Sequence, residues 1–283
     1  MDKKVIGILA AIILIIAIVI VCLAFGNKKE EVPTNPVVIV NESGEKEVKV
    51  SRNVETDPYT ANVPNEIFDF YLEKVNEIEK KHKEEQAKLI EDNPDGIELA
   101  SLTKLKYDLV FFDDNNIPEL VVTDTGHNTR LYTYDAGKVI YAMREDGDES
   151  GEEYGWVFGA GGNQGYEFVP RANILRNINS DYAGLIRYYA FYKLDENEHR
   201  LVDNFDGVLC EYHFEDTNEN GNVDEDEREN YVEDATAYYV GDKKVTAEEA
   251  KNYVVVSDDY EFLQGTKTAE DFIKLLQSLV NEK

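Results

Sequence analysis

The chain has 283 residues, and its 58 acidic and 29 basic residues give a formal net charge of −29. A protein this acidic repels phosphate backbones and anionic lipid headgroups, which argues against nucleic-acid binding and against docking on a charged membrane surface. The same charge favours solubility and attracts divalent cations.

An apolar segment follows a short tail at residues 1–4. It runs from Val5 to Phe25 without a charge, and at about 1.5 Å per residue it can cross the roughly 30 Å hydrocarbon core of a bilayer. A cleaved signal peptide has a shorter apolar region, of about 7–15 residues, followed by a small-residue cleavage site. Cys22 raises a lipoprotein alternative, but Val21 stands where lipoprotein signals carry a small residue. We therefore predict an uncleaved transmembrane anchor at residues 5–25.

The flanks of this segment bear on its orientation. Two lysines precede it and Lys28 and Lys29 follow it, so the count of positive charges is nearly balanced. The short tail and the long remainder suit a signal-anchor with a cytoplasmic tail at 1–4 and the large C-terminal part outside. We therefore expect a single-pass protein of the cell membrane. Cys22 and Cys210 provide no intrachain disulfide framework.

Residues 26–62 read as a tether, because they combine prolines and many charges with a single apolar island at 37–40 that can form a lone strand. From residue 63 the pattern becomes that of a folded domain, which we expect to span 63–283. Asn65 is positioned to cap a helix that begins at Glu66, with apolar residues at helical spacing. Residues 77–91 are mostly charged and form either a solvated helix or a spacer, and Asn93-Pro-Asp-Gly ends the pattern.

Short strands follow. Runs rich in Val, Leu and aromatic residues, separated by turn residues, predict strands at 107–112, 119–123, 129–134, 139–143, 167–169, 184–193, 209–214 and 234–240. Residues 135–138 and 195–198 read as hairpin turns. Helices return at Thr246, which opens a capping box, and at Thr268, which caps 269–280. The predicted fold class is α+β, mainly antiparallel sheet with flanking helices, preceded by a single N-terminal transmembrane helix.

The segment from Asp216 to Glu227 matches the calcium-loop pattern D-x-[DN]-x-[DN]-G-x5-E at every fixed position. Gly221 stands where the chain must turn sharply, and Val223 takes a position that is usually apolar. The predicted ligands, which supply the oxygens that a hard cation requires, are Asp216, Asn218, Asn220, Asn222, Asp224 and Glu227. The preceding residues 207–214 alternate like a strand, so we expect an isolated loop and not a paired EF-hand. The alternative is a chance product of acidic composition.

Residues 112–120, with the sequence FDDNNIPEL, resemble the D-x-D-x-D-G-x-P-E-L strand-loop-strand element of extracytoplasmic proteins from Gram-positive anaerobes. That element is similar to the calcium-associated loops of FG-GAP/VCBS-like repeats. The chain departs from it, because Phe111 replaces the first aspartate and Asn116 the glycine. Asp113, Asn115 and Glu119 remain as candidate oxygens, and whether this loop also binds metal stays open. We expect it mainly to form a tight strand connection pinned by Pro118.

Other segments give weaker signals. The acidic stretch 145–153 reads as a flexible loop, and the glycine-rich stretch 159–165 lacks the ending of a phosphate loop. Trp156, beside Asn163 and Gln164, can stack on a sugar, but ordinary core packing is the simpler reading. The histidines (His82, His127, His199 and His213) are scattered, no nucleophile motif is present, and Cys210 reads as a packed thiol.

The sequence therefore predicts a membrane-anchored extracytoplasmic protein that binds calcium at residues 216–227, with the membrane and an unknown extracytoplasmic ligand as partners. Extracellular calcium sites of about 10⁻⁴–10⁻³ M affinity are filled constitutively, so the ion would brace the fold. A surface binding or sensing module is the leading reading. The alternatives are an envelope hydrolase with paired carboxylates and a structural stalk-and-head protein.

Overall fold

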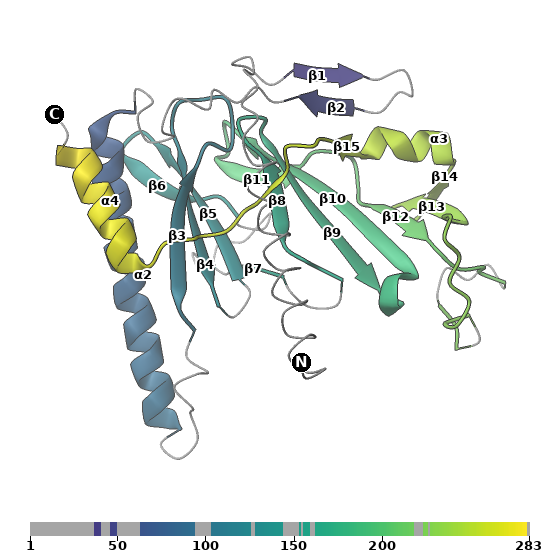
Figure 1. The fold of residues 1–283 in the computed structure, drawn as a ribbon, viewed down its shortest axis with the longest axis horizontal. Coiled ribbons are helices and arrows are strands. Elements are labelled where there is room, and N and C mark those ends of the chain that lie inside the picture. Colours follow the sequence, from purple (N-terminus) through teal and green to yellow (C-terminus); the bar gives the residue numbers. More distant parts are fainter. Residues whose placement is uncertain are drawn as a thin grey trace, which may run out of the picture.

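A computed structural model describes the backbone of residues 37–40 and 46–49, and residues 63–93, 103–125, 128–143, 153, 155–158, 162–217, 223–225 and 227–281 (Figure 1). The predicted tail and anchor lie outside these residues. None of the described helices is long and apolar enough to cross a membrane.

Helix α2 (Asn65–Asp92) is the first long element. Its buried stripe consists of Ile67, Phe68, Tyr71, Val75 and Ile78. The charged continuation after Ile78 is helical too, so of the two readings for 77–91 the helix is correct. The predicted cap was wrong: Pro64 is the N-cap, and Asn65 is inside the helix, where its Nδ2 donates to the carbonyl of Val280 at 3.2 Å.

Two helices cover one face of a five-stranded antiparallel sheet, here called the helix-covered sheet. Its strands are β3 (Leu105–Val110), β4 (Glu119–Asp124), β5 (Asn128–Asp135), β6 (Lys138–Tyr141) and β7 (Trp156–Val157). The predicted hairpin between β5 and β6 is confirmed, with φ of 45° at Ala136 and 82° at Gly137, as a primed turn requires. Helix α4 (Ala269–Asn281), capped by Thr268 as predicted, lies beside α2 on this sheet.

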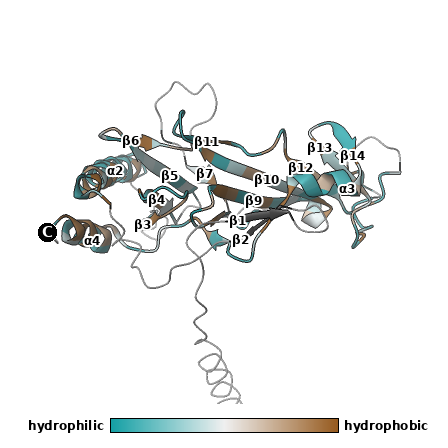
Figure 2. Ribbon diagram, turned by 90° about the horizontal axis from the view of Figure 1, so that it is seen from above, coloured by the Kyte–Doolittle hydropathy of each residue, from teal (hydrophilic) through white to brown (hydrophobic). Residues whose placement is uncertain are grey.

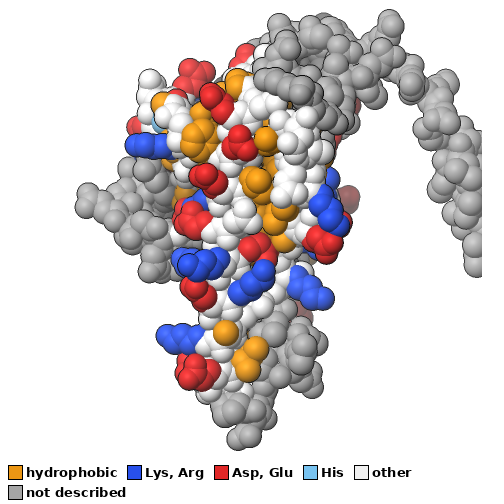
Figure 3. All heavy atoms as spheres, turned by 90° about the vertical axis from the view of Figure 1, so that its left-hand side faces the viewer, with side chains coloured by type: hydrophobic (Ala, Val, Ile, Leu, Met, Phe, Trp, Pro, Cys, Tyr) orange, Lys and Arg blue, Asp and Glu red, His pale blue; other side chains and the backbone are white. Residues whose placement is uncertain are grey.

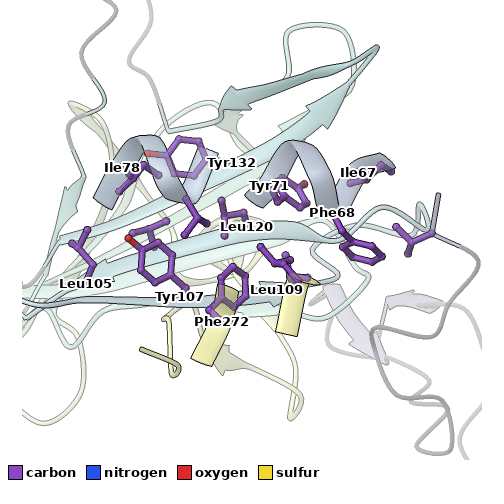
Figure 4. Packing of buried hydrophobic residues seen from close by; sticks show 14 of the residues in the cluster. Ile67, Phe68, Tyr71, Ile78, Leu105, Tyr107, Leu109, Leu120, Tyr132 and Phe272 are labelled. Atoms are coloured by element: carbon purple, nitrogen blue, oxygen red, sulfur yellow. The ribbon is translucent and has the colours of Figure 1, made fainter. Parts of the chain in front are cut away.

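The core beneath these helices combines aliphatic side chains with aromatic rings (Figure 4). The rings of Tyr107 and Phe272 stack with their centroids 5.6 Å apart, and both side chains are fully buried. Tyr71 is also buried, and its hydroxyl donates to the carbonyl of Pro118 at 2.6 Å. Tyrosine suits this position because its ring fills the core while its hydroxyl finds an acceptor at the edge.

A second antiparallel sheet of eight strands, here called the large sheet, has the order β14-β13-β12-β10-β9-β8-β16, with β11 on β10. Its strands are β8 (Tyr166–Val169), β9 (Ile174–Asp181), β10 (Ile186–Asp195), β11 (Arg200–Asp203), β12 (Leu209–Tyr212), β13 (Ala237–Val240), β14 (Lys243–Val245) and β16 (Glu261–Phe262). The short 3₁₀ turn η2 (Tyr182–Gly184) joins β9 to β10. The predicted turn at 195–198 is confirmed. Strand β9 was missed, because Asn177, Asn179 and Ser180 give it a polar sequence.

The strand predicted at 37–40 exists and is not alone. Strands β1 (Val37–Val40) and β2 (Lys46–Lys49) pair antiparallel, and β15 (Val255–Val256) adds to β2 in parallel. Part of the predicted tether therefore belongs to a sheet. The capping box at Thr246 is confirmed at the start of α3 (Ala247–Ala250), which continues into η3 (Lys251–Tyr253). Figure 2 shows α2 and α4 at one end of the molecule and α3 at the other.

The segment from Leu263 to Lys267 crosses from the large sheet to the helix-covered sheet (Figure 1). Leu263 N donates to the carbonyl of Tyr166 at 2.7 Å, and Thr129 Oγ1 donates to the carbonyl of Leu263 at 3.0 Å. Tyr107 and Lys267 then exchange two backbone hydrogen bonds. A Cβ on Gly265 would lie 2.2 Å from the carbonyl oxygen of Lys106, so only glycine fits this crossing. The described part of the chain is thus α+β and mainly antiparallel, as predicted.

The two phenylalanines Phe272 and Phe262 provide a matched test of this core. Phe272→Ala removes a fully buried ring and should lower the free energy of unfolding by about 3–5 kcal/mol. Phe262→Ala removes a ring that is 47% exposed and should cost less than about 1 kcal/mol. Urea unfolding followed by the fluorescence of Trp156, the one tryptophan, measures both. Equal losses would mean that α4 does not seal the core.

Candidate metal site

The predicted calcium loop leaves the large sheet after β12 and returns to it at β13. The two ends of this excursion are tied together directly. Val232 N donates to the carbonyl of His213 at 2.8 Å, and Thr236 N donates to the carbonyl of Tyr212 at 2.7 Å. The strand expected before the loop is confirmed, so the loop begins from a fixed edge of sheet.

His213 holds the base of the loop. Its side chain is 3% exposed, and its Nδ1 lies 3.2 Å from the carbonyl oxygen of Val232 and 3.1 Å from that of Glu233. Carbonyl oxygens only accept, so Nδ1 carries the proton. Nε2 lies 3.5 Å from Glu211 Oε2 and has no hydrogen-bond partner in the described part of the chain. No sequence pattern indicates this role, because the contact joins residues 20 positions apart.

Glu227, the last predicted ligand, folds back across the loop and is 2% exposed. Its Oε1 accepts from Thr217 N at 2.8 Å and from Thr217 Oγ1 at 3.0 Å, while its Oε2 accepts from Asp224 N at 3.0 Å. These backbone hydrogen bonds, from Asp224 first and then from Thr217, lower the pKa of the Glu227 carboxyl. An ionised carboxylate is therefore already held against both ends of the loop.

Val223 anchors the middle of the loop. Its side chain is buried with Phe214, Leu185 and Ile186 in a cluster at the end of the large sheet. Glu227 N also donates to the carbonyl of Asp224 at 3.1 Å, while Asp224 N donates to Glu227 Oε2. This reciprocal pair resembles half of a helix capping box and shapes a single turn. The described residues that follow, 227–236, form turns and irregular structure.

The donor set is described only in part. Asp216, Asp224 and Glu227 have described positions, whereas Asn218, Asn220 and Asn222 lie outside the described residues. Within the described residues, no group of three or more His, Cys, Asp or Glu side chains is arranged to hold a metal ion. The chemistry of the full set, all oxygen with three carboxylates, still suits calcium or a similar hard cation.

The second acidic loop, between β3 and β4, is a tight connection as predicted. Asn115 N donates to Asp113 Oδ1 at 3.0 Å, Asn115 Nδ2 donates to Asp113 Oδ2 at 2.8 Å, and Ile117 N donates to Asn115 Oδ1 at 2.7 Å. The Tyr71 hydroxyl binds the Pro118 carbonyl and fixes the end of the loop. Asp113 and Glu119 are both buried, at 6% and 0% exposure, so they cannot serve as an open pair of catalytic carboxylates.

A polar cleft of about 650 Å³ lies between α2 and the edge of the helix-covered sheet. Its acidic groups are engaged: Glu153 accepts from Lys74 Nζ at 2.7 Å and from the Tyr132 hydroxyl at 2.8 Å. Asp124 accepts from Asn128 Nδ2 at 3.0 Å. Glu153 is the only residue of the predicted flexible loop 145–153 with a described position. These pairings make the cleft a structural network and not a poised acid–base pair.

The region of Trp156 supports core packing. Its ring lies 4.9 Å from that of Tyr192 and 5.4 Å from that of Tyr166, measured between centroids, and it packs on the cluster between the two sheets. Asn163 Oδ1 accepts from Asn177 Nδ2 at 2.8 Å, so this amide is engaged within the protein. Residues 159–161 of the glycine-rich stretch lie outside the described residues.

Burial raises the pKa of the Cys210 thiol, which opposes a nucleophilic thiolate.

The chain matches no protein-family model, and comparisons with curated proteins and with solved structures find no significant match. The resemblance of residues 112–120 to the extracytoplasmic element therefore stays a prediction.

His213 offers a test of the loop's base. His213→Ala leaves the carbonyls of Val232 and Glu233 without their donor and should lower the free energy of unfolding by about 1–3 kcal/mol. His213→Asn places an amide N–H near the position of Nδ1 and should recover a large part of this loss. Thermal melts of the two variants compare them, and equal destabilisation would mean that packing of the ring, and not its hydrogen bonds, holds the loop.

Proposed function

We propose that the chain is a single-pass membrane protein whose extracytoplasmic domain binds calcium at residues 216–227 and serves as a surface binding or sensing module. The observation that carries the calcium part is the position of Glu227. The one carboxylate that a calcium loop uses as its clamp is buried, ionised and bonded to Thr217 and Asp224, at opposite ends of the loop. A chance acidic run would leave this side chain in solvent.

The sequence supports the location. The uninterrupted apolar run at 5–25 is long enough to span a bilayer, and the long C-terminal part suits an outward orientation. Outside the cell, calcium is abundant enough to fill a site of about 10⁻⁴–10⁻³ M affinity at all times. Calcium would then act as a permanent brace, and the excess of acidic residues would raise the local concentration of the ion.

The brace would act locally. Binding would pull Asp216, Asp224 and Glu227 toward one ion and so fix the excursion between β12 and β13, whose base His213 already holds. This end of the large sheet lies far from α2 and α4 (Figure 1). The expected result is a more stable edge of sheet, with little change in the helix-covered sheet.

The face formed by α2 and α4 supports the binding part of this proposal. A groove of about 820 Å³ runs between the two helices, and Figure 3 shows apolar side chains there among lysines and glutamates. Ala269 and Ile273 line its floor, and Lys80, Lys83 and Lys274 stand at its rim together with acidic residues. A groove of mixed charge with an apolar floor can accept an amphipathic segment of a protein partner.

The stalk-and-head reading is kept as a second candidate on one observation. Helix α2 has 28 residues, about 42 Å at 1.5 Å per residue, and its C-terminal part extends beyond the sheet (Figure 1). Leu89 and Ile90 near its end are 47% and 49% exposed. The envelope hydrolase has no comparable support, since Asp113 and Glu119 are buried and the acids Asp124 and Glu153 of the polar cleft accept hydrogen bonds from neighbouring side chains.

Calorimetric titration of a soluble fragment (residues 27–283) with calcium tests the metal site. This fragment keeps β1 and β2, which pair with β15. We expect saturable binding of one ion with a dissociation constant near 10⁻⁴–10⁻³ M and a higher melting temperature in calcium. Both effects should disappear in the double variant Asp216→Ala plus Glu227→Ala.

The matched control is Glu215→Ala plus Glu229→Ala, which removes the same charge from exposed positions beside the loop. At fixed ionic strength this control should bind calcium like the parent fragment. If the two double variants lose binding equally, the effect is general attraction of cations to an acidic surface and the site does not exist.

A further inference from the structure

Glu119 is the most unusual ionisable group of the described chain. It is the first residue of β4, and its side chain is completely buried under the connection from β3. Its Oε2 accepts from Phe112 N at 2.9 Å, but its Oε1 has no hydrogen-bond partner among the residues that the structure describes. A bare carboxylate oxygen in the core is strongly unfavourable unless a positive charge or a proton compensates it.

The charged groups around Glu119 determine how much positive charge is needed to compensate it. The acid that acts on it is Asp113, whose two oxygens both accept from Asn115; burial raises the pKa of the Asp113 carboxyl, and the hydrogen bond from Asn115 N opposes this rise. Among the described residues, one cation acts on both acids: Arg171, whose guanidinium lies 4.1 Å from the centre of the Phe111 ring. Two carboxylates and one guanidinium leave one uncompensated negative charge.

The more distant groups add no positive charge to this cluster. Asp114 and Glu196 act on Asp113 from the loop and from the β10–β11 turn, and both are acidic and exposed. Tyr71 of α2 is neutral at physiological pH, because burial raises the pKa of its hydroxyl well above its usual range. Burial, followed by the charge of Asp113, raises the pKa of the Glu119 carboxyl well above its usual range. Within the described part of the chain, a single proton makes the cluster neutral.

We propose that Glu119 is a carboxylic acid at neutral pH and that its ionisation loosens the junction between the helix-covered sheet and the large sheet. A proton is favoured over a metal ion because it needs no space, and because a divalent ion would leave this buried cluster with a net positive charge. The proposal is independent of calcium binding at residues 216–227.

The contact between the two sheets begins at Phe112, the residue that Glu119 binds. Phe112 donates its N–H to Glu119, and the carbonyl of the same residue accepts from Asn173 N at 2.9 Å. Asn173 in turn donates from Nδ2 to the carbonyl of Leu194 at 2.9 Å and accepts from Leu194 N at 2.6 Å. Hydrogen bonds therefore run without a break from the start of β4 to β10 in the other sheet.

The turn at residues 171–173 has an unfavourable backbone conformation, so its stability depends on the contacts around it. Arg171 and Asn173 have positive φ values of 60° and 55°. Side chains other than glycine adopt this region only where surrounding contacts impose it. Arg171 N contributes such a contact, donating to the carbonyl of Phe111 at 2.8 Å. Charge on Glu119 repels Asp113 and draws water to the same loop, which weakens these contacts.

The direction of the pH effect follows from proton linkage. A glutamate in the unfolded chain titrates near pH 4.3, whereas Glu119 in the folded chain titrates well above that value. Between the two pKa values the folded state binds more protons, so its stability falls as pH rises, by up to tenfold in the folding equilibrium constant per pH unit. The stability contributed by the proton is fully present in acid and is lost when the pH passes the folded-state pKa.

Glu119→Gln in the full-length chain, kept in a mild detergent, tests the proposal. The amide oxygen of Gln still accepts from Phe112 N, and the side chain cannot ionise. Urea unfolding between pH 5 and pH 9 at fixed ionic strength, followed by Trp156 fluorescence, should show a falling midpoint in the parent chain. The variant should show a flatter profile and, at pH 8, a folding equilibrium constant at least about tenfold higher.

The matched control is Glu73→Gln, at an exposed position of α2, which should follow the parent profile with the same slope. Parallel profiles for all three proteins would overturn the proposal. Infrared spectroscopy adds a readout that does not depend on stability. The C=O band of a protonated carboxylic acid should be present in the folded parent chain at pH 7 and missing in Glu119→Gln, and its absence from the parent would also overturn the proposal.

A metal ion in place of the proton has its own signature. Calcium would then stabilise the parent chain at pH 8, and this effect would be lost in Glu119→Gln while it survived in Asp216→Ala plus Glu227→Ala. That outcome would overturn the proton assignment and leave calcium binding at residues 216–227 to be decided separately. We expect calcium to stabilise the parent chain and Glu119→Gln to the same extent.

Discussion

The architecture depends on closing two antiparallel sheets against each other along one apolar seam. Other elements cover the opposite face of each sheet. Helices α2 and α4 cover that of the helix-covered sheet, and the chain around α3 and β15 covers part of that of the large sheet. The seam itself is built from both sheets, with Phe112, Val121 and Leu131 on one side and Phe168, Leu175 and Leu194 on the other. Without it, both sheets would expose an apolar face to water.

Apolar packing alone does not fix how the two sheets are positioned relative to each other. Polar interactions between them do. Two of these lie at opposite places on the seam: the turn at 171–173, which binds Phe111 and Phe112, and the crossing segment 263–267, which binds Tyr107 and Tyr166. Backbone hydrogen bonds are directional, so they select one register of contact from many of similar apolar area. The buried carboxyl of Glu119 belongs to the first of these places, which explains how one proton can affect a seam formed by many side chains.

The proposed calcium loop at residues 216–227 lies apart from this seam. It is fastened to the far end of the large sheet through His213, Thr236 and Val223, which hold the loop's two ends and its middle. Glu227 accepts hydrogen bonds from Thr217 and Asp224, which hold its carboxylate across the loop. A cation bound there would add to an existing local structure, which is consistent with a brace and not with a switch between two folds.

Patterns of short range were readable from the sequence. The strands at 119–123 and 129–134, the capping box at Thr246 and the hairpin at 135–138 depend on neighbours within a few residues, and the structure has them all. Strand β9 was not readable, because its polar residues gain strand structure only from β8 and β10 on either side. The cap assigned to Asn65 failed for a related reason: its amide binds Val280, which is distant in sequence and near in space.

The sequence by itself determined the acidic character, the apolar run at 5–25, the oxygen-rich pattern of 216–227 and the antiparallel α+β class. These follow from composition and from periodicity over a few residues, which any local segment carries with it. Only the tertiary structure decided that Glu119 is sealed from water beside Asp113 and Arg171, that His213 closes the base of the loop, and that β1 and β2 join β15. Burial and partner choice depend on which distant segments meet, and that is set by packing of the whole chain.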